Sequence, residues 1–254
     1  MSGAAAIGID AGSTTCKGVA VDADGRLVAR RVEPASPRVD EQSRRMVAAL
    51  RDDAGGGEPG VAATGYGRKR VAAGRVVTEI TCHARGAFAL TGRPGLLVDM
   101  GGQDTKAIRV GKGGEVLDFA MNDKCAAGTG RFLEVILGRL QIPLDEVAAH
   151  AARAPRAVAV SSTCTVFAES EVISLVAGGE PLDGIVKGLH ASLASRVASL
   201  ARAAPDDEVW MSGGVALNAA MVAALSEAMG RPVRIVPEPQ LVGALGAALS
   251  LLRG

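Results

Sequence analysis

The chain contains an internal repeat, which limits its possible folds more than any other feature of the sequence. The segment Ile7–Gly12, IGIDAG, is followed 89 residues later by the similar segment Leu96–Gly101, LLVDMG. At this offset five pairs of identical residues align without a gap, namely Asp10 with Asp99, Gly12 with Gly101, Lys17 with Lys106, Val21 with Val110, and Gly25 with Gly114. Chance could align one Asp-x-Gly turn with another, but the five ungapped matches predict two related lobes.

Each copy of the repeat has the same predicted order of elements. An apolar strand leads into an Asp-x-Gly turn, an alternating strand, a glycine turn and a third strand, and helical segments follow. Further strands are expected at 60–64, 208–211 and 232–236, and helices at 38–51, 79–90, 130–140, 144–153, 166–177, 181–203, 217–229 and 241–252. This alternation predicts an α/β fold. The first lobe is expected at 1–92 and the second at 93–254, with the last helix, about 240–254, packing back on the first lobe.

The first Asp-x-Gly turn is a candidate phosphate-binding loop. Backbone N–H groups in such a turn can face a phosphate, and glycine lets the chain approach it closely. We expect Asp10 to hold Mg²⁺ through water, because hard cations prefer oxygen ligands and retained waters. The residues expected to bind the nucleotide here are Gly12, Ser13, Thr14, Thr15 and Lys17. A lone turn of this kind is more often an ordinary hairpin, but its repetition favours phosphate binding.

The second copy offers the same loop with two further polar side chains. Asp99, Gly101 and Gly102 are expected to contact the nucleotide, while Gln103 and Asp104 are placed to orient a water molecule. Two such loops facing each other across a cleft would hold the phosphates of ATP from both sides.

Three further segments are weaker candidates for the nucleotide site. Glu79 stands at a predicted helix start, where it could assist water activation, although a charge that stabilises the helix end is the commoner role. Two small-residue segments, one after a strand and one at a helix start, suit close approach to an adenosine base. Their key residues are Gly213 and Gly214 in the first, and Gly243 and Ala244 in the second. Each pattern alone also occurs as a tight turn.

Two of the four cysteines stand immediately before predicted helix starts. Cys125 and Cys164 lie 39 residues apart and no Cys-x-x-Cys is present, so one chain cannot easily build a four-ligand metal site from them. A symmetric dimer would bring four thiolates to its axis, as a [4Fe–4S] cluster requires, and helix N-termini would stabilise that anionic group. Composition alone favours buried, small apolar roles for cysteines, and we assign such roles to Cys16 and Cys82.

Composition and charge exclude several other classes of function. The 28 Lys and Arg residues against 27 Asp and Glu give no general field for nucleic acid or membranes. No apolar run approaches the ~20 residues of a membrane span, and no signal peptide is visible, so a cytoplasmic protein with reduced thiols or metal ligands is expected. The three histidines, His83, His150 and His190, are scattered and are expected to have surface or capping roles.

Eight segments spread along the chain carry a recognisable pattern. They are Gly8–Thr14, Ala63–Arg68, Glu79–Gly86, Asp99–Asp104, Met121–Arg131, Ser161–Glu171, Ser212–Ala216 and Gly243–Ala248. In these segments the chain resembles the ATP-dependent activators of 2-hydroxyacyl-CoA dehydratases, a group that also holds the ATPase subunits of benzoyl-CoA reductase. The resemblance runs from residue 7 to about residue 250, and the two cysteine segments are highly specific to the group.

This resemblance implies an actin-like ATPase fold of two ribonuclease-H-like lobes, with mixed sheets flanked by helices. It also implies a homodimer that bridges one [4Fe–4S] cluster, with ligands falling on Cys125 and Cys164. Such activators take an electron from a ferredoxin or flavodoxin. They use ATP to pass it at very low potential to a separate 2-hydroxyacyl-CoA dehydratase. ATP can drive this step only if the ATP and ADP states differ in conformation.

Two alternatives stay open from the sequence. The ATPase subunit of a benzoyl-CoA reductase shares the cysteines but works inside a larger permanent complex. An actin-like sugar kinase or a nucleotide-switched scaffold would need no cluster. However, no convincing set of sugar-binding residues lies between Gly25 and Leu90, and a scaffold has no reason to place cysteines at two helix starts. The sequence specifies neither the acyl-CoA nor the electron donor.

Overall fold

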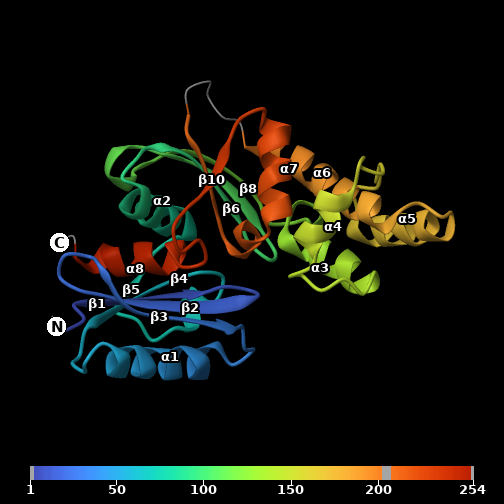
Figure 1. Cartoon of the computed structure of the whole chain (residues 1–254). Helices are drawn as coiled ribbons and strands as arrows, with labels where there is room; N and C mark the ends of the chain where they lie inside the picture. The colour runs from blue at the N-terminus through green and yellow to red at the C-terminus, as the bar shows by residue number, and fades with distance from the viewer. Residues whose placement is uncertain (1–2, 202–206, 253–254) are drawn as a thin grey trace. The chain divides into compact units, whose positions relative to one another are not determined.

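The computed structural model describes residues 3–201 and 207–252, and these residues form two five-stranded sheets (Figure 1). The first sheet has the strand order β3-β2-β1-β4-β5, and the second has the order β10-β9-β6-β7-β8. Counted along the chain within each sheet, both have the order third, second, first, fourth, fifth. The glycines that match in the repeat, Gly25 and Gly114, also share a left-handed backbone, with φ of 80° and 79°. The sequence repeat is therefore a repeat of sheet topology.

The first sheet is built around a buried central strand. Its strands are β1 (Ala6–Ala11), β2 (Thr15–Val21), β3 (Leu27–Pro34), β4 (Gly60–Thr64) and β5 (Arg75–Val76). β1 pairs antiparallel with β2 and parallel with β4, which places Asp10 opposite Lys17 on one side and Thr64 on the other. All six residues of β1 are buried, because helices cover both faces of this sheet.

Those helices lie on opposite sides of the sheet, as Figure 1 shows. They are α1 (Val39–Asp53) and α8 (Val242–Leu252), and α2 (Glu79–Thr91) packs in turn against α8. Met46 and Leu50 of α1 pack on one face, and Leu245 of α8 packs on the other. A Cβ atom at Gly8 would lie 1.9 Å from the carbonyl oxygen of Ala244. Glycine is therefore required for α8 to approach β1 this closely.

The second sheet supports a larger apolar core. Its strands are β6 (Gly95–Met100), β7 (Thr105–Val110), β8 (Val116–Asn122), β9 (Val209–Ser212) and β10 (Val233–Ile235). The helices that follow along the chain are α3 (Gly130–Arg139), α4 (Val147–Arg153), α5 (Thr165–Ala177), α6 (Leu182–Leu200) and α7 (Ala219–Met229). Phe132 of α3, Leu189 of α6 and Met221 of α7 are fully buried with Val98 of β6. Burial of aliphatic side chains and this one phenyl ring supplies most of the stabilisation expected here.

The described residues divide into two compact units. One lies within Met1–Gly95, Ile108–Phe119 and Val236–Gly254, and the other within Leu96–Ala107 and Ala120–Ile235. Each unit is thus discontinuous in sequence, because the chain returns to the first unit twice after Gly95.

Several element boundaries differ from the sequence predictions for local reasons. The helix expected at 217–229 is preceded by a separate 3₁₀ turn, η4 (Gly214–Leu217), and α7 begins only at Ala219. Asn218 causes this break, because its side chain caps α7 by accepting hydrogen bonds from the N–H groups of Ala220 and Met221. Shorter 3₁₀ turns, which the sequence analysis missed, are η1 (Arg68–Arg70), η2 (Lys112–Gly114) and η3 (Ala126–Gly128).

Two predicted helices extend beyond the part of the chain that is described. Residues 202 and 203 of the helix expected at 181–203, and residues 253 and 254 of the one expected at about 240–254, lie outside the described residues. Within residues 3–201 and 207–252, no helix combines the length and the apolar character needed to cross a bilayer.

Candidate functional site

The first candidate phosphate loop connects β1 to β2 and comprises Gly12, Ser13 and Thr14. Ser13 and Thr14 are exposed, so both hydroxyl groups are accessible to a ligand. A Cβ atom at Gly12 would lie 2.8 Å from the Thr15 carbonyl oxygen and 3.0 Å from Lys17 Nζ. The loop is therefore as tight as the sequence analysis expected, and glycine keeps its backbone accessible.

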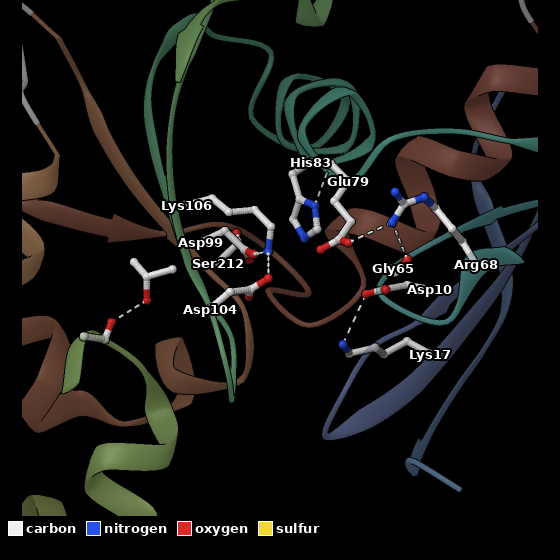
Figure 2. Close-up of polar contacts among 12 residues, drawn as sticks. Asp10, Lys17, Gly65, Arg68, Glu79, His83, Asp99, Asp104, Lys106 and Ser212 are labelled. Carbon is white, nitrogen blue, oxygen red and sulfur yellow. Dashed lines mark hydrogen bonds and ion pairs between the residues drawn. The ribbon is translucent and has the colours of Figure 1, made fainter. Parts of the chain in front are cut away.

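Asp10 stands at the carboxyl end of β1 beside this loop, with only 5% of its surface exposed. Its Oδ2 atom lies 3.1 Å from Lys17 Nζ, which balances the buried charge (Figure 2). Two glycines let other segments approach the same carboxylate. A Cβ atom at Gly65 would lie 2.4 Å from Asp10 Oδ1, and one at Gly243 would lie 3.2 Å from Oδ2. Two segments far apart in sequence, the end of β4 and the start of α8, therefore converge on Asp10.

The start of α2 adds three polar groups to this part of the site. Thr78 caps the helix, and Glu79 in its first turn lies 3.2 Å from the Arg68 guanidinium, which also donates a 2.8 Å hydrogen bond to the Gly65 carbonyl. The His83 ring nitrogen Nδ1 lies 2.9 Å from the Glu79 carbonyl oxygen (Figure 2). His83 is buried, so its expected surface or capping role is wrong.

Arg68 and His83 were not predicted as site residues. Sequence signals for both were available, because Arg68 ends one of the recognisable segments and His83 follows Glu79 by one helical turn. Gly243 lies against both His83 and Asp10, since a Cβ atom there would be 2.8 Å from His83 Cε1. Ala244 is fully buried against β1, and its role in binding adenosine stays a prediction.

The second candidate phosphate loop, between β6 and β7, repeats the aspartate–lysine pair. Lys106 Nζ lies 3.5 Å from Asp99 Oδ2 and 2.8 Å from Asp104 Oδ2 (Figure 2). Lys106 and Asp99 are both buried, and the Ser212 hydroxyl donates a 2.7 Å hydrogen bond to Asp99 Oδ1. Gln103 at the loop tip is exposed, as its expected role in orienting water requires.

Glycines again allow close contacts around this second aspartate. Gly213 has a left-handed backbone with φ of 87°, and a Cβ atom there would lie 2.2 Å from the Met100 carbonyl oxygen. Gly214 begins the 3₁₀ turn that ends at the cap residue Asn218.

His190 Nε2 lies 3.0 Å from the Asn218 amide nitrogen, and burial lowers the pKa of His190. This histidine is therefore a buried neutral residue that orients the cap residue Asn218, and the surface role expected for it is wrong.

The segment of the first cysteine is hydrogen-bonded to the second phosphate loop. The N–H groups of Gly130 and Arg131, at the start of α3, donate to the carbonyl oxygens of Gly101 and Gly102 at 2.9 and 2.8 Å. The hydroxyl of Thr105, in β7, donates a 2.7 Å hydrogen bond to the carbonyl oxygen of Gly128. Cys125 is exposed at the start of η3, three residues before Gly128. A phosphate loop and a cysteine segment are thus continuous in one hydrogen-bond network.

The segment of the second cysteine is held by a carboxylate. Cys164 is exposed and stands at the N-cap of α5, as the sequence analysis predicted. Glu171 accepts hydrogen bonds from Ser161 N, Ser161 Oγ and Ser162 N at 2.8, 2.8 and 2.7 Å. Although burial opposes the change, these hydrogen bonds lower the pKa of Glu171 to about 2. Glu171 therefore holds this loop as a carboxylate at neutral pH.

The other two cysteines have a different environment. Cys16 and Cys82 are buried, and burial raises the pKa of each thiol to about 12. Their predicted role as small apolar residues is confirmed. Among the described residues, no group of three or more His, Cys, Asp and Glu side chains could hold a metal ion within one chain. The exposed thiols available to a shared metal group are therefore those of Cys125 and Cys164.

Comparisons with known proteins identify close relatives. The BadF/BadG/BcrA/BcrD ATPase family matches residues 7–250. An activator of lactoyl-CoA dehydratase from Anaerotignum propionicum is 49% identical over 189 residues, 74% of this chain and 73% of that protein. The (R)-2-hydroxyglutaryl-CoA dehydratase activating ATPase from Acidaminococcus fermentans is 41% identical over 249 residues, 96% of this chain and 95% of that protein.

A solved structure supports the same relationship. The activator of the 2-hydroxyisocaproyl-CoA dehydratase from Clostridium difficile, with bound ADPNP, has a TM-score of 0.88 and 37% identity. The match covers 97% of this chain and 94% of that one. The predicted actin-like ATPase fold, with two mixed sheets flanked by helices, is therefore confirmed. On the family match and these identities, the chain belongs to the BadF/BadG/BcrA/BcrD ATPase family.

Proposed function

We propose that the chain is an ATP-hydrolysing activator that transfers a low-potential electron to a 2-hydroxyacyl-CoA dehydratase. The observation that carries the proposal is the combination, in one chain, of two glycine-lined aspartate loops with two exposed cysteines at helix starts. An ATPase without a redox role has no need of the cysteines. Three relatives that match over most of this chain are named as activators of such dehydratases.

The two loops suit a nucleotide and Mg²⁺ in their donor chemistry. Exposed hydroxyls at Ser13 and Thr14 and backbone N–H groups can meet phosphate oxygens, and the Lys17 ammonium stands beside the loop. Asp10 supplies a buried carboxylate for a hydrated Mg²⁺, as that ion usually requires. In the second loop, Gln103 and Asp104 orient the water that attacks the terminal phosphate. The bound ADPNP of the related activator supports nucleotide binding by this chain.

The donor set of the cysteine segments fits an iron–sulfur group shared by two chains. A [4Fe–4S] cluster takes four thiolates, and each chain offers two exposed thiols, so a homodimer is required. No side chain caps the start of α5, so its first N–H groups can stabilise negative charge beside Cys164. When bound, the cluster would supply one-electron transfer at low potential. We further propose that the electron comes from a ferredoxin or flavodoxin.

The test is oxygen-free purification followed by iron and sulfide analysis and a sizing measurement. We expect a brown dimer with about four iron atoms, one cluster for two chains. Cys125→Ser and Cys164→Ser should each lose colour and iron while nucleotide binding survives, and Cys16→Ala serves as a control that removes a buried thiol. If both exposed-cysteine variants stay brown, the assignment of the ligands is wrong.

A second experiment separates a mobile activator from a subunit of a permanent complex. The purified protein, reduced by ferredoxin, is mixed with a 2-hydroxyacyl-CoA dehydratase, and electron transfer is followed with and without ATP. Transfer that requires ATP hydrolysis supports the proposal. A protein that copurifies in a fixed stoichiometric complex with an aryl-CoA reductase, and reduces no dehydratase, contradicts it.

A further inference from the structure

Arg196 occupies a position between the two cysteine segments. It lies on α6 and is half-buried. Its Nη1 atom donates a 2.9 Å hydrogen bond to the carbonyl oxygen of Thr163, the residue before Cys164. Its Nε and Nη2 atoms donate to the carbonyl and hydroxyl oxygens of Ser192 at 3.0 and 2.9 Å, which fixes the orientation of the guanidinium. Arg196 therefore holds the Cys164 segment from its backbone side.

The same guanidinium also contacts the helix that follows Cys125. It lies 4.5 Å from the centroid of the Phe132 ring, in the first turns of α3. Phe132 is fully buried, so the ring is a fixed platform for the planar cation. The Ser192 hydroxyl, which orients Arg196, also donates to the Val160 carbonyl oxygen at 3.1 Å. Two segments that are separate in sequence are thus joined through one side chain.

The charge of Arg196 lies beside the Cys164 segment, since its guanidinium bonds to the residue before Cys164. No Asp or Glu among residues 3–201 and 207–252 forms an ion pair with it. Burial lowers the pKa of Arg196, and negative charge at Cys125 would act in the opposite direction. A half-buried cation with no carboxylate partner is favourable where an anionic group binds nearby.

We propose that Arg196 is a positioning residue for the shared metal site, which joins the two cysteine segments and supplies a positive charge to the anionic group that they bind. The proposal rests on the proposed function. Lysine cannot replace Arg196 fully, because only the planar guanidinium group makes both the stacking contact with Phe132 and the directed hydrogen bonds. The positive charge favours the reduced, more negative state of the bound group. Its removal should therefore make that group harder to reduce.

The experiment compares Arg196→Met and Arg196→Lys with the wild type, all purified without oxygen. Arg156→Met is the control, because Arg156 lies on the surface and pairs with Glu180. A redox titration followed by electron paramagnetic resonance gives the midpoint potential. In Arg196→Met the ratio of reduced to oxidised cluster at a fixed potential should fall about tenfold, a shift of about 59 mV for one electron. Arg196→Lys should keep a potential close to wild type but lose iron to a chelator several-fold faster.

A second readout needs no bound metal. Amide hydrogen exchange in the metal-free chain should be several-fold faster over residues 160–166 in Arg196→Met, and unchanged in Arg156→Met. The inference would be overturned if Arg196→Met had the same midpoint potential, iron chelation rate and hydrogen exchange as the wild type. A colourless wild type would instead contradict the proposed function, while the exchange measurement would still decide whether Arg196 positions the Cys164 segment.

Discussion

At the residue scale, each candidate phosphate loop lies beside an aspartate that is paired with a lysine on the next strand. Asp10 with Lys17, and Asp99 with Lys106, occupy equivalent positions in the two sheets. The pairing places a positive charge beside each buried carboxylate, next to a candidate phosphate loop. The sequence offset predicted the equivalence of these residues. It could not predict the salt bridges, because side-chain directions depend on the folded register.

The role of the first aspartate can be tested by a substitution that conserves its shape. Asp10→Asn removes the carboxylate that we propose for Mg²⁺, and ATP turnover should fall about 100-fold or more. The iron content should not change, since Cys125 and Cys164 are untouched. Steady-state phosphate release and iron analysis measure both effects. Asp24→Asn alters an exposed aspartate and is the matched control; equal turnover in the two variants would remove Asp10 from the mechanism.

Glu171 gives a prediction about pH. Its pKa is about 2 in the folded chain and 4.5 in an ordinary glutamate, so its stabilising hydrogen bonds are complete above about pH 4.5 and are lost as the pH falls toward 2. Glu171→Gln should lower the free energy of unfolding at pH 7 by about 1–2 kcal/mol, a value reduced by solvent screening at this half-buried site. Urea unfolding should show the difference from wild type shrinking between pH 5 and pH 3. A difference that is constant with pH would contradict this account.

At the element scale, the starts of helices carry the site. η3 begins after Cys125, α5 after Cys164 and α2 at Glu79. The starts of α5 and α2 were predicted within one residue from local sequence, whereas η3 was missed. Local rules succeeded because caps and breakers act over a few residues. They failed for Arg196, which lies in the middle of α6 and was not considered as a site residue. Its contacts with Thr163 and Phe132 join elements that only the tertiary fold brings together.

The contact between β7 and the segment of Cys125 predicts how the nucleotide affects the cysteine. Thr105 is fully buried, and Thr105→Val removes the hydroxyl that bonds to Gly128 while keeping the shape of the side chain. The unpaired carbonyl should cost about 1–3 kcal/mol in urea unfolding. An ATP analogue should change the rate at which iodoacetamide modifies Cys125 in metal-free wild type, and this change should shrink in Thr105→Val. Thr105→Ser keeps the hydroxyl and should show the same change in modification rate as the wild type. An equal change in all three proteins would contradict a connection between the nucleotide and Cys125 through Thr105.

At the scale of the whole molecule, the repeat predicted the common topology of both sheets but not the division of the chain. Residues 108–119 group with the first unit although they follow the start of the second copy, and β5 has only two residues. Such features depend on which unit the chain joins after a long loop. The hydrophobic periodicity of the sequence does not specify this. The approach of Gly65 and Gly243 to Asp10 was missed for the same reason. The sequence pattern therefore does not determine which distant segments of the chain come together in the fold.

The proposed homodimer predicts a role for apolar residues beside Cys164. Val166 and Phe167 at the start of α5 are each 68% exposed, which is unusual for neighbouring large apolar side chains. Phe167→Glu should weaken the dimer at least about tenfold and reduce its iron content, as sedimentation and iron analysis without oxygen would measure. Leu144→Glu changes an apolar residue of similar exposure away from the cysteines and should have no effect. Equal loss in both variants would argue against an interface at α5.

The position of α8 has a consequence for how the protein is made. One face of β1 is covered by α8, which comes much later in the sequence, and Gly8 lets the two elements approach closely at Ala244. Until α8 has been synthesised, the apolar face of β1 and β4 that it covers stays exposed to solvent. This unit can therefore finish folding only after residues 242–252 have been synthesised.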